Sequence, residues 1–213
     1  MTGNSTLGDV MMLKKVLLLT SAAMLTACGS PEAEIDRPDA DNTLDVATEM
    51  MTDTDADTVV MMSQSFPVMN TSGAEIGTVT VSDQSAGGVT VTLDVTAITA
   101  GAHAVHFHET GRCDGPDFTS AGGHYNPMGN NHGFDADAPN PHAGDMPNVE
   151  APQSGVVQTV IENERVSLSP REGMAPLFDA NGTAFIIHAD ADDYVSQPTG
   201  AAGSRIACAV IAP

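Results

Sequence analysis

Between positions 89 and 96 apolar and polar residues alternate without interruption, as Val-Thr-Val-Thr-Leu-Asp-Val-Thr. This two-residue period is typical of a β-strand with one buried and one exposed face. Seven further segments have a strand-like composition, at residues 59–66, 74–81, 102–109, 155–161, 165–168, 183–189 and 205–211. The domain shows no convincing helical period. Eight short strands separated by Gly, Asn and Pro predict an all-β fold, an antiparallel sandwich or barrel.

Two stretches interrupt the strand pattern. Residues 110–154 are rich in Gly, Pro, Asn and Asp and poor in apolar residues, and a shorter loop spans residues 190–204. A loop as long as the first is uncommon in a compact domain unless it carries function or is disordered. This loop holds His124, His132, His142, Asp145 and Cys113, so we expect bound metal and a disulfide to order it.

All seven histidines lie between His103 and His188. Imidazole is the commonest transition-metal ligand in proteins. On a strand, His106 and His108 point to the same face and can converge on one ion. Taken singly, each histidine has a plainer interpretation, as a polar residue of a strand face or loop, or as a hydrogen-bonded core residue. Together they offer enough ligands for two metal ions.

The charge balance limits the partners of this chain. It carries 28 acidic residues against seven lysines and arginines, a formal net charge of −21. From residue 59 onward four arginines stand against 17 acidic residues, which makes −13. The basic patch that nucleic-acid binding requires is absent, and the negative charge argues against broad binding to anionic lipid surfaces.

The N-terminus has the pattern of an export signal. Lys14 and Lys15 precede an apolar run at 16–24 that is too short to span a bilayer. The run leads into Leu-Thr-Ala-Cys, which resembles a bacterial lipobox, so residues 1–28 are predicted to be a signal peptide that ends at a lipidated Cys28. An ordinary secretory signal with a chance cysteine is the alternative. Residues 29–58, rich in acidic residues, are predicted to be a flexible tether, and residues 59–213 form the domain.

Two cysteines remain if Cys28 carries lipid. Export places Cys113 and Cys208 in an oxidising compartment, where a disulfide can persist. In the chain-entropy model a loop of this length favours a stabilisation of about 4–5 kcal/mol. The alternative is a pair of unlinked buried thiols.

Several motifs resemble the copper–zinc superoxide dismutase family. They are His-Ala-Val-His-Phe-His-Glu at 103–109, Ser-Ala-Gly-Gly-His-Tyr-Asn-Pro at 120–127, Asn-His-Gly at 131–133, His-Ala-Gly-Asp-Met-Pro-Asn at 142–148, Ile-Ile-His-Ala at 186–189 and Gly-Ser-Arg-Ile-Ala-Cys at 203–208. The resemblance covers about residues 59–213. It implies an eight-stranded antiparallel Greek-key β-barrel or sandwich with two long functional loops.

The resemblance also implies one copper ion and one zinc ion per subunit. The copper ligands match His106, His108, His124 and His188. The zinc ligands match His124, His132, His142 and Asp145. His124 then bridges both ions as an imidazolate. Four imidazoles suit Cu(II), and three imidazoles with a carboxylate suit tetrahedral Zn(II).

Further positions match residues that surround the metals in this family. Asp192 matches a carboxylate that hydrogen-bonds His106 and His132 and so links the two metal sites. Arg205 matches the arginine beside the copper at the end of a narrow substrate channel, and Thr199 matches the other channel residue. A surface charge or a salt bridge is the plainer interpretation of Arg205.

The cysteines and the seventh histidine complete the comparison of motifs. Cys113 and Cys208 match the intrasubunit disulfide of the family. His103 matches no ligand, and we expect it to hydrogen-bond across the loops behind the copper. The chain departs from the family pattern at Ala104, Ala201 and Ala209, which concerns local packing and not the ligands.

The implied activity is the disproportionation of superoxide to dioxygen and hydrogen peroxide outside the cytoplasm, with His124 and Arg205 as catalytic residues. A lipoprotein anchored to a membrane, facing the periplasm or the cell exterior, is the expected location. A homodimer is compatible with the sequence, but no feature indicates an interface.

A non-enzymatic exported protein that binds copper or zinc is the first alternative to this function. A structural or adhesive β-sandwich is the second, and it leaves the ligands and Arg205 unexplained.

Overall fold

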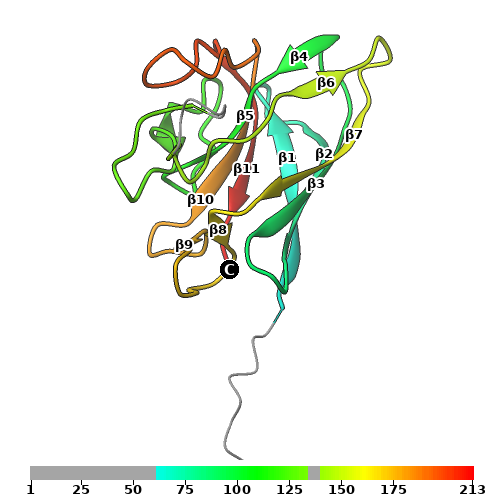
Figure 1. Cartoon of the computed structure of the whole chain (residues 1–213). Helices are drawn as coiled ribbons and strands as arrows, with labels where there is room; N and C mark the ends of the chain where they lie inside the picture. Colours follow the sequence, from blue (N-terminus) through cyan, green and yellow to red (C-terminus); the bar gives the residue numbers. More distant parts are fainter. Residues whose placement is uncertain (1–60, 134–139) are drawn as a thin grey trace, which may run out of the picture. The chain divides into compact units, whose positions relative to one another are not determined.

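The computed structural model describes residues 61–133 and 140–213, and β-strands dominate its backbone (Figure 1). The strands are β1 (Ser63–Asn70), β2 (Glu75–Asp83), β3 (Val89–Val95), β4 (Gly101–His103), β5 (Val105–His108), β6 (Val149–Ala151), β7 (Val157–Asn163), β8 (Val166–Ser167), β9 (Ala175–Pro176), β10 (Thr183–His188) and β11 (Arg205–Ile211). A short 3-10 helix, η1 (Thr119–Ala121), follows β5. The all-β prediction is therefore confirmed.

The structure does not describe the N-terminal part of the chain, where two predicted segments lie. The signal peptide at 1–28, with Cys28, and the tether at 29–58 lie outside the described residues. Within residues 61–133 and 140–213, no helix has the length and the hydropathy that crossing a membrane requires.

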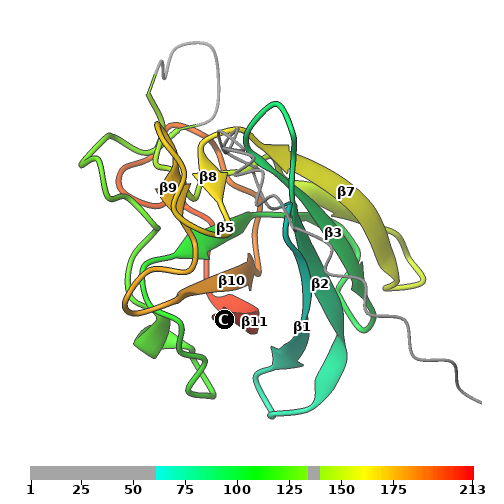
Figure 2. The same cartoon turned by 90° about the horizontal axis from the view of Figure 1, so that it is seen from below.

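Seven strands form one antiparallel sheet in the order β5-β10-β11-β1-β2-β3-β7. Figure 2 shows that this sheet is curled, with β1, β2, β3 and β7 on one side and β5, β10 and β11 on the other. The chain passes from β3, next to one edge, to β5 at the other edge, and then returns from β5 to β7 beside β3. The predicted count of eight strands needs a correction, because β8 pairs in parallel with β9 and not with the main sheet.

Strand boundaries differ from the prediction in three places. The segment predicted at 59–66 is β1, which continues through Pro67 to Asn70; the proline is tolerated because β1 pairs with β11 only at Met69 and Asn70. The segment predicted at 102–109 divides at Ala104 into β4, which pairs with β6, and β5, which pairs with β10. Strands β6 and β9 were not predicted, since segments of three and two residues are too short to show a period.

The alternation along β3 produces the core. Val89, Val91, Leu93 and Val95 are fully buried, and they pack with inward residues of β1, β2, β7, β10 and β11. Strands β5 and β10 are buried at every position, because the loops of the candidate site cover their other face. The histidines of these two strands therefore lie between the sheet and the loops.

A disulfide attaches the first long loop to the sheet. Cys113 in that loop is bonded to Cys208 at the centre of β11, with 5.7 Å between their Cα atoms. Cys208 is buried in a small cluster with Phe118 and Ile186. The predicted pairing is confirmed, and the link holds the segment around Phe118 against β10 and β11.

Gly144 allows the second half of the loop to approach β5. The Phe107 N–H donates to the Gly144 carbonyl oxygen at 2.9 Å, and the Gly144 N–H donates to the Tyr125 carbonyl oxygen at 2.9 Å. A Cβ atom added at Gly144 would lie 2.3 Å from the carbonyl oxygen of Phe107. No larger residue fits here without moving the backbone.

We therefore predict that Gly144→Ala destabilises the metal-free protein by about 1–3 kcal/mol, the usual cost of overpacking. Gly123→Ala is the matched control, because its added Cβ would meet nothing closer than Glu109 Oε1 at 3.8 Å. Denaturant unfolding measures both variants. Equal stability of the two would show that the close approach at Gly144 is not a constraint.

Candidate metal centre

The structure brings the predicted ligands together into two buried clusters. One contains His106, His108, His124 and His188, and the other contains His124, His132, His142 and Asp145. In each cluster the ligand atoms lie within 4.8 Å of one another. We refer to them as the copper cluster and the zinc cluster. Their only common member among the described residues is His124.

Strands β5 and β10 position most of the copper cluster. His106 and His108 alternate on β5, and His188 ends the neighbouring strand β10. The Nδ1–H of His108 donates to the Gly122 carbonyl oxygen at 3.0 Å, which turns its Nε2 toward His188 Nε2 at 3.4 Å. His124 enters from the loop through a β-bridge with His108.

The zinc cluster surrounds the carboxylate of Asp145. Its Oδ1 lies 2.9 Å from His124 Nδ1 and 3.3 Å from His142 Nδ1. Its Oδ2 lies 3.1 Å from His132 Nδ1. Because Nδ1 of His124 faces this cluster, its Nε2 is left for the copper cluster.

Three buried ring nitrogens indicate that these residues fit metal ions. His106 Nδ1 and His124 Nε2 have no hydrogen-bond partner, and His132 Nδ1 forms no well-aligned hydrogen bond, although it lies 3.1 Å from Asp145 Oδ2. Burying a polar atom without a partner costs about 1–3 kcal/mol. These nitrogens belong to the two clusters, and a coordinated ion would satisfy each of them. The donor sets, four imidazoles and three imidazoles with a carboxylate, suit Cu(II) and Zn(II) respectively.

Asp192 connects the two clusters from behind, as predicted. His106 Nε2–H donates to Asp192 Oδ2 at 2.8 Å, and His132 Nε2–H donates to Asp192 Oδ1 at 2.9 Å. Both bonds leave Nδ1 as the coordinating atom of each ring. Gly200 allows this arrangement, since a Cβ atom there would lie 1.8 Å from Asp192 Oδ1.

Burial and carboxylates set the protonation of the rings. Burial lowers the pKa of His124 to about 4 and the pKa of His188 to about 3, so both are neutral ligands at neutral pH. Burial also opposes the charged form of His132, but Asp145 and Asp192 outweigh it and raise the pKa of His132 to about 9. Burial would raise the pKa of Asp145, but its bonds to three histidines hold it far below the ordinary value.

Arg205 lies beside the copper cluster. Its Nη1 donates to the Phe118 carbonyl oxygen and its Nη2 to the Gly122 carbonyl oxygen, both at 2.6 Å. Gly122 also accepts the bond from His108, so one carbonyl group positions both a ligand and the guanidinium. Arg205 lines an open pocket of about 420 Å³ together with Thr71, Pro116, Asp117, Thr119, Gly203, Ser204 and Ile206.

Two predicted residues have different outcomes. Thr199 is an exposed residue of the loop between β10 and β11, and it is not among the residues that line the Arg205 pocket. His103 is buried, with Nδ1 2.7 Å from the His188 carbonyl oxygen and Nε2 2.8 Å from the Thr99 carbonyl oxygen. The structural role predicted for His103 is confirmed.

Three supporting residues were not predicted. Gln197 Oε1 accepts the His132 N–H at 2.8 Å, and its Nε2 donates to the His132 carbonyl oxygen at 2.7 Å. Asn148 exchanges two bonds with the Asp192 main chain, at 2.8 and 2.9 Å. Arg165 donates to main-chain carbonyls of two zinc-cluster residues. Of these three residues, only Arg165 could have been noticed in the sequence, because arginine is scarce in this domain.

The fold and the site together define a class, an all-β protein with a histidine-bridged pair of copper and zinc sites. The family profile described as copper/zinc superoxide dismutase (SODC) matches residues 75–211. Superoxide dismutase (Cu-Zn) 1 of Aquifex aeolicus is 41% identical over 145 residues, which cover 68% of this chain and 84% of that protein. The chain belongs to the copper/zinc superoxide dismutase family.

Other relatives agree with this assignment. The superoxide dismutase (Cu-Zn) of Caulobacter vibrioides is 41% identical over 143 residues, covering 65% of this chain and 79% of that protein. Among solved structures, a SOD-like protein from Bacillus subtilis superposes with a TM-score of 0.65 at 33% identity, covering 69% of this chain and 97% of that one. The Cu/Zn superoxide dismutase from Brucella abortus gives a TM-score of 0.57 at 26% identity, covering 70% and 99%.

We predict that Asp192→Asn weakens binding of both metals by about 10- to 100-fold, as is typical of outer partners of metal ligands. The amide has one acceptor oxygen in place of two, so it cannot accept from both rings. Chelator competition with copper and with zinc measures the affinities. Asp193→Asn is the matched control, because the exposed carboxylate of this neighbour accepts hydrogen bonds from Val195 and Ser196 of its own turn. Wild-type affinities in Asp192→Asn would contradict the linking role.

Proposed function

We propose that this protein disproportionates superoxide outside the cytoplasm. Two superoxide anions and two protons yield one dioxygen and one hydrogen peroxide. The observation that carries the proposal is the position of Arg205, whose guanidinium shares the Gly122 carbonyl oxygen with the copper ligand His108. A protein that only stores metal has no need of a cation fixed at this pocket.

The side chains divide the work between binding and proton transfer. Arg205 presents fixed donors that attract and orient a small anion at the copper cluster. Copper, when bound, supplies the one-electron oxidation and reduction. His124 Nε2, which faces the copper cluster, takes up a proton while the first superoxide is oxidised. It releases that proton to the second superoxide as it is reduced, and solvent supplies the other proton of hydrogen peroxide.

The location forms the second part of the proposal. The lysine pair, the short apolar run and the Leu-Thr-Ala-Cys motif ending at Cys28 support export and lipid anchoring. The acidic segment at 29–58 then serves as the tether between the anchor and the domain. The protein faces the periplasm or the cell exterior, where the Cys113–Cys208 disulfide persists.

We predict that Arg205→Ala lowers kcat/KM for superoxide by about 10- to 100-fold, the loss of a charge-assisted hydrogen bond worth roughly 1.5–3 kcal/mol. Copper and zinc contents should stay those of the wild type. Arg171→Ala is the matched control, because the Arg171 guanidinium donates to the carbonyl oxygens of Gln84 and Ser85. These two residues lie between β2 and β3 and belong to neither cluster. If the wild-type protein binds both metals and removes no superoxide, the proposal is wrong and a metal-buffering protein is favoured.

The charge balance predicts an unusual salt dependence. The domain is strongly acidic, and the loop at 190–204 has three aspartates and no cation, so the overall field repels superoxide. Salt screens this repulsion as ionic strength rises from about 0.01 M to about 0.15 M. We expect kcat/KM to stay constant or to increase over this range in stopped-flow assays. A steep decrease would mean that local attraction dominates capture.

Lipid anchoring is tested separately. Cells that express the full chain and grow with labelled palmitate should yield a labelled protein in the membrane fraction, and Cys28→Ala should abolish both the label and the membrane association. Release of an unlabelled wild-type protein would contradict the anchor. It would leave the enzymatic proposal intact.

A further inference from the structure

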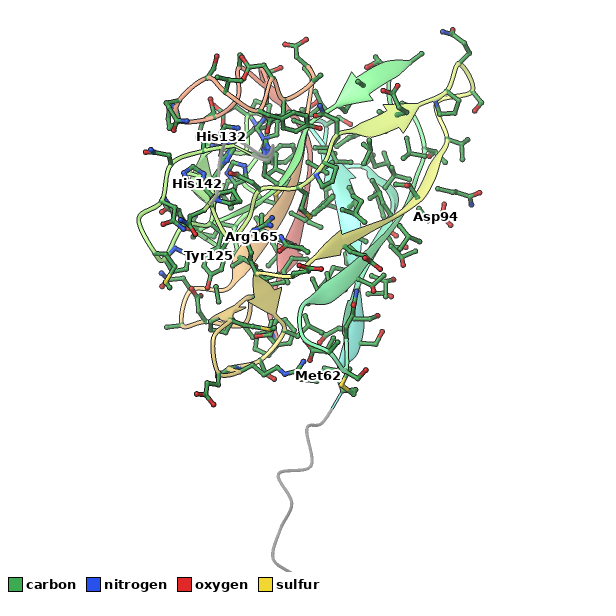
Figure 3. The ribbon with its side chains drawn as sticks, viewed as in Figure 1. Met62, Asp94, Tyr125, His132, His142 and Arg165 are labelled. Carbon is green, nitrogen blue, oxygen red and sulfur yellow. A yellow bond between two sulfur atoms is a disulfide. The ribbon has the colours of Figure 1, made fainter. Side chains whose placement is uncertain are left out.

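Arg165 lies in the tight turn between β7 and β8, outside both metal clusters. It is one of only four arginines after residue 58. Its Nε donates to the His142 carbonyl oxygen at 3.2 Å, and its Nη2 donates to the Asp145 carbonyl oxygen. Figure 3 shows Arg165 on the side of the fold that carries His142. One guanidinium therefore binds the main chain of two zinc-cluster residues.

Asn163, the last residue of β7, completes these contacts. It is buried, its Oδ1 accepts the Arg165 N–H at 2.9 Å, and its Nδ2 donates to the Ala143 carbonyl oxygen at 2.9 Å. The Gly144 carbonyl oxygen accepts from the N–H of Phe107. Every carbonyl group from residue 142 to residue 145 thus has a partner outside the segment, and two of these bonds come from Arg165.

This segment needs such support because no strand contains it. His142 and Asp145 lie in a turn closed by the Asp145 N–H, which donates to the His142 carbonyl oxygen at 3.2 Å. The Asp145 carboxylate accepts the N–H groups of His142 and Gly133 at 3.1 and 3.2 Å. These bonds shape the turn and join it to Gly133, whereas Arg165, Asn163 and the Phe107 N–H attach it to the sheet.

We propose that Arg165 is a positioning residue of the zinc cluster: its guanidinium holds the main chain at His142 and Asp145 so that both ligands converge before zinc arrives. The positive charge of Arg165 by itself opposes a divalent cation nearby. Its contribution to zinc binding therefore comes from the directed, planar donors of the guanidinium. Lysine has the same charge but cannot reproduce that geometry.

The test compares the zinc affinity of Arg165→Lys with that of wild type in disulfide-intact, metal-free protein, by chelator competition. Cobalt(II) bound in place of zinc reports the ligand geometry through its absorption spectrum. We expect Arg165→Lys to weaken zinc binding by about 10- to 100-fold and to shift the cobalt bands. Arg171→Lys is the control, since its guanidinium bonds the carbonyl oxygens of Gln84 and Ser85. It should leave zinc affinity and spectrum unchanged.

Arg165→Met separates geometry from charge. If the guanidinium acts by positioning, zinc affinity falls in this variant as well; if its charge dominates, removing the repulsion raises the affinity. Thermal unfolding of each metal-free variant defines a temperature at which it is folded, and affinities are compared there. Wild-type zinc affinity and cobalt spectrum in Arg165→Lys, or an equal loss in Arg171→Lys, would overturn the inference.

The inference rests on the zinc part of the proposed function and not on superoxide turnover. Both readouts are measured without superoxide. A protein that binds zinc and removes no superoxide would therefore contradict the proposed activity and leave the role of Arg165 standing.

Discussion

The imidazole of His124 is the constraint on which the centre depends. Its Nδ1 lies 2.9 Å from Asp145, and its Nε2 is a buried atom without a hydrogen-bond partner. One ring therefore serves both clusters, and neither can shift without disturbing the other. The β-bridge to His108 and the close approach at Gly144 hold the chain on either side of this ring against β5. The curled sheet thus supports the loop that fixes the position of the His124 ring.

The acidic composition makes the few cations of the domain informative. Two of its four arginines, Arg165 and Arg205, donate to main-chain carbonyls in the loop that carries the ligands. Arg205 also serves the proposed substrate, so its position is tied through Gly122 to the copper ligand His108. The disulfide from Cys113 to Cys208 adds a covalent attachment of the same loop. Arg205 thus supplies a local positive charge to the proposed substrate against an unfavourable overall field.

Short-range patterns predicted most of the strands, the resemblance to the family supplied the assignment of the ligands, and long-range contacts explain the rest. The alternation at β3 and the spacing of His106 and His108 depend on local backbone geometry. Strand β9 and its separate pairing with β8 depend on contacts between distant segments, which the local alternation of residues does not reveal. Gln197 could not be predicted as a support of His132, because 65 residues separate the bonded groups. The Greek-key resemblance implied eight strands, and the curled sheet holds seven.

The most direct test of the account is diffraction from crystals loaded with copper and zinc, with anomalous data collected at both absorption edges. The account predicts two separate ions, copper among His106, His108 and His188, and zinc among His132, His142 and Asp145. The ring of His124 should lie between them with Nε2 toward copper and Nδ1 toward zinc. A single ion, or a His124 ring that contacts only one metal, would contradict the shared-ligand centre.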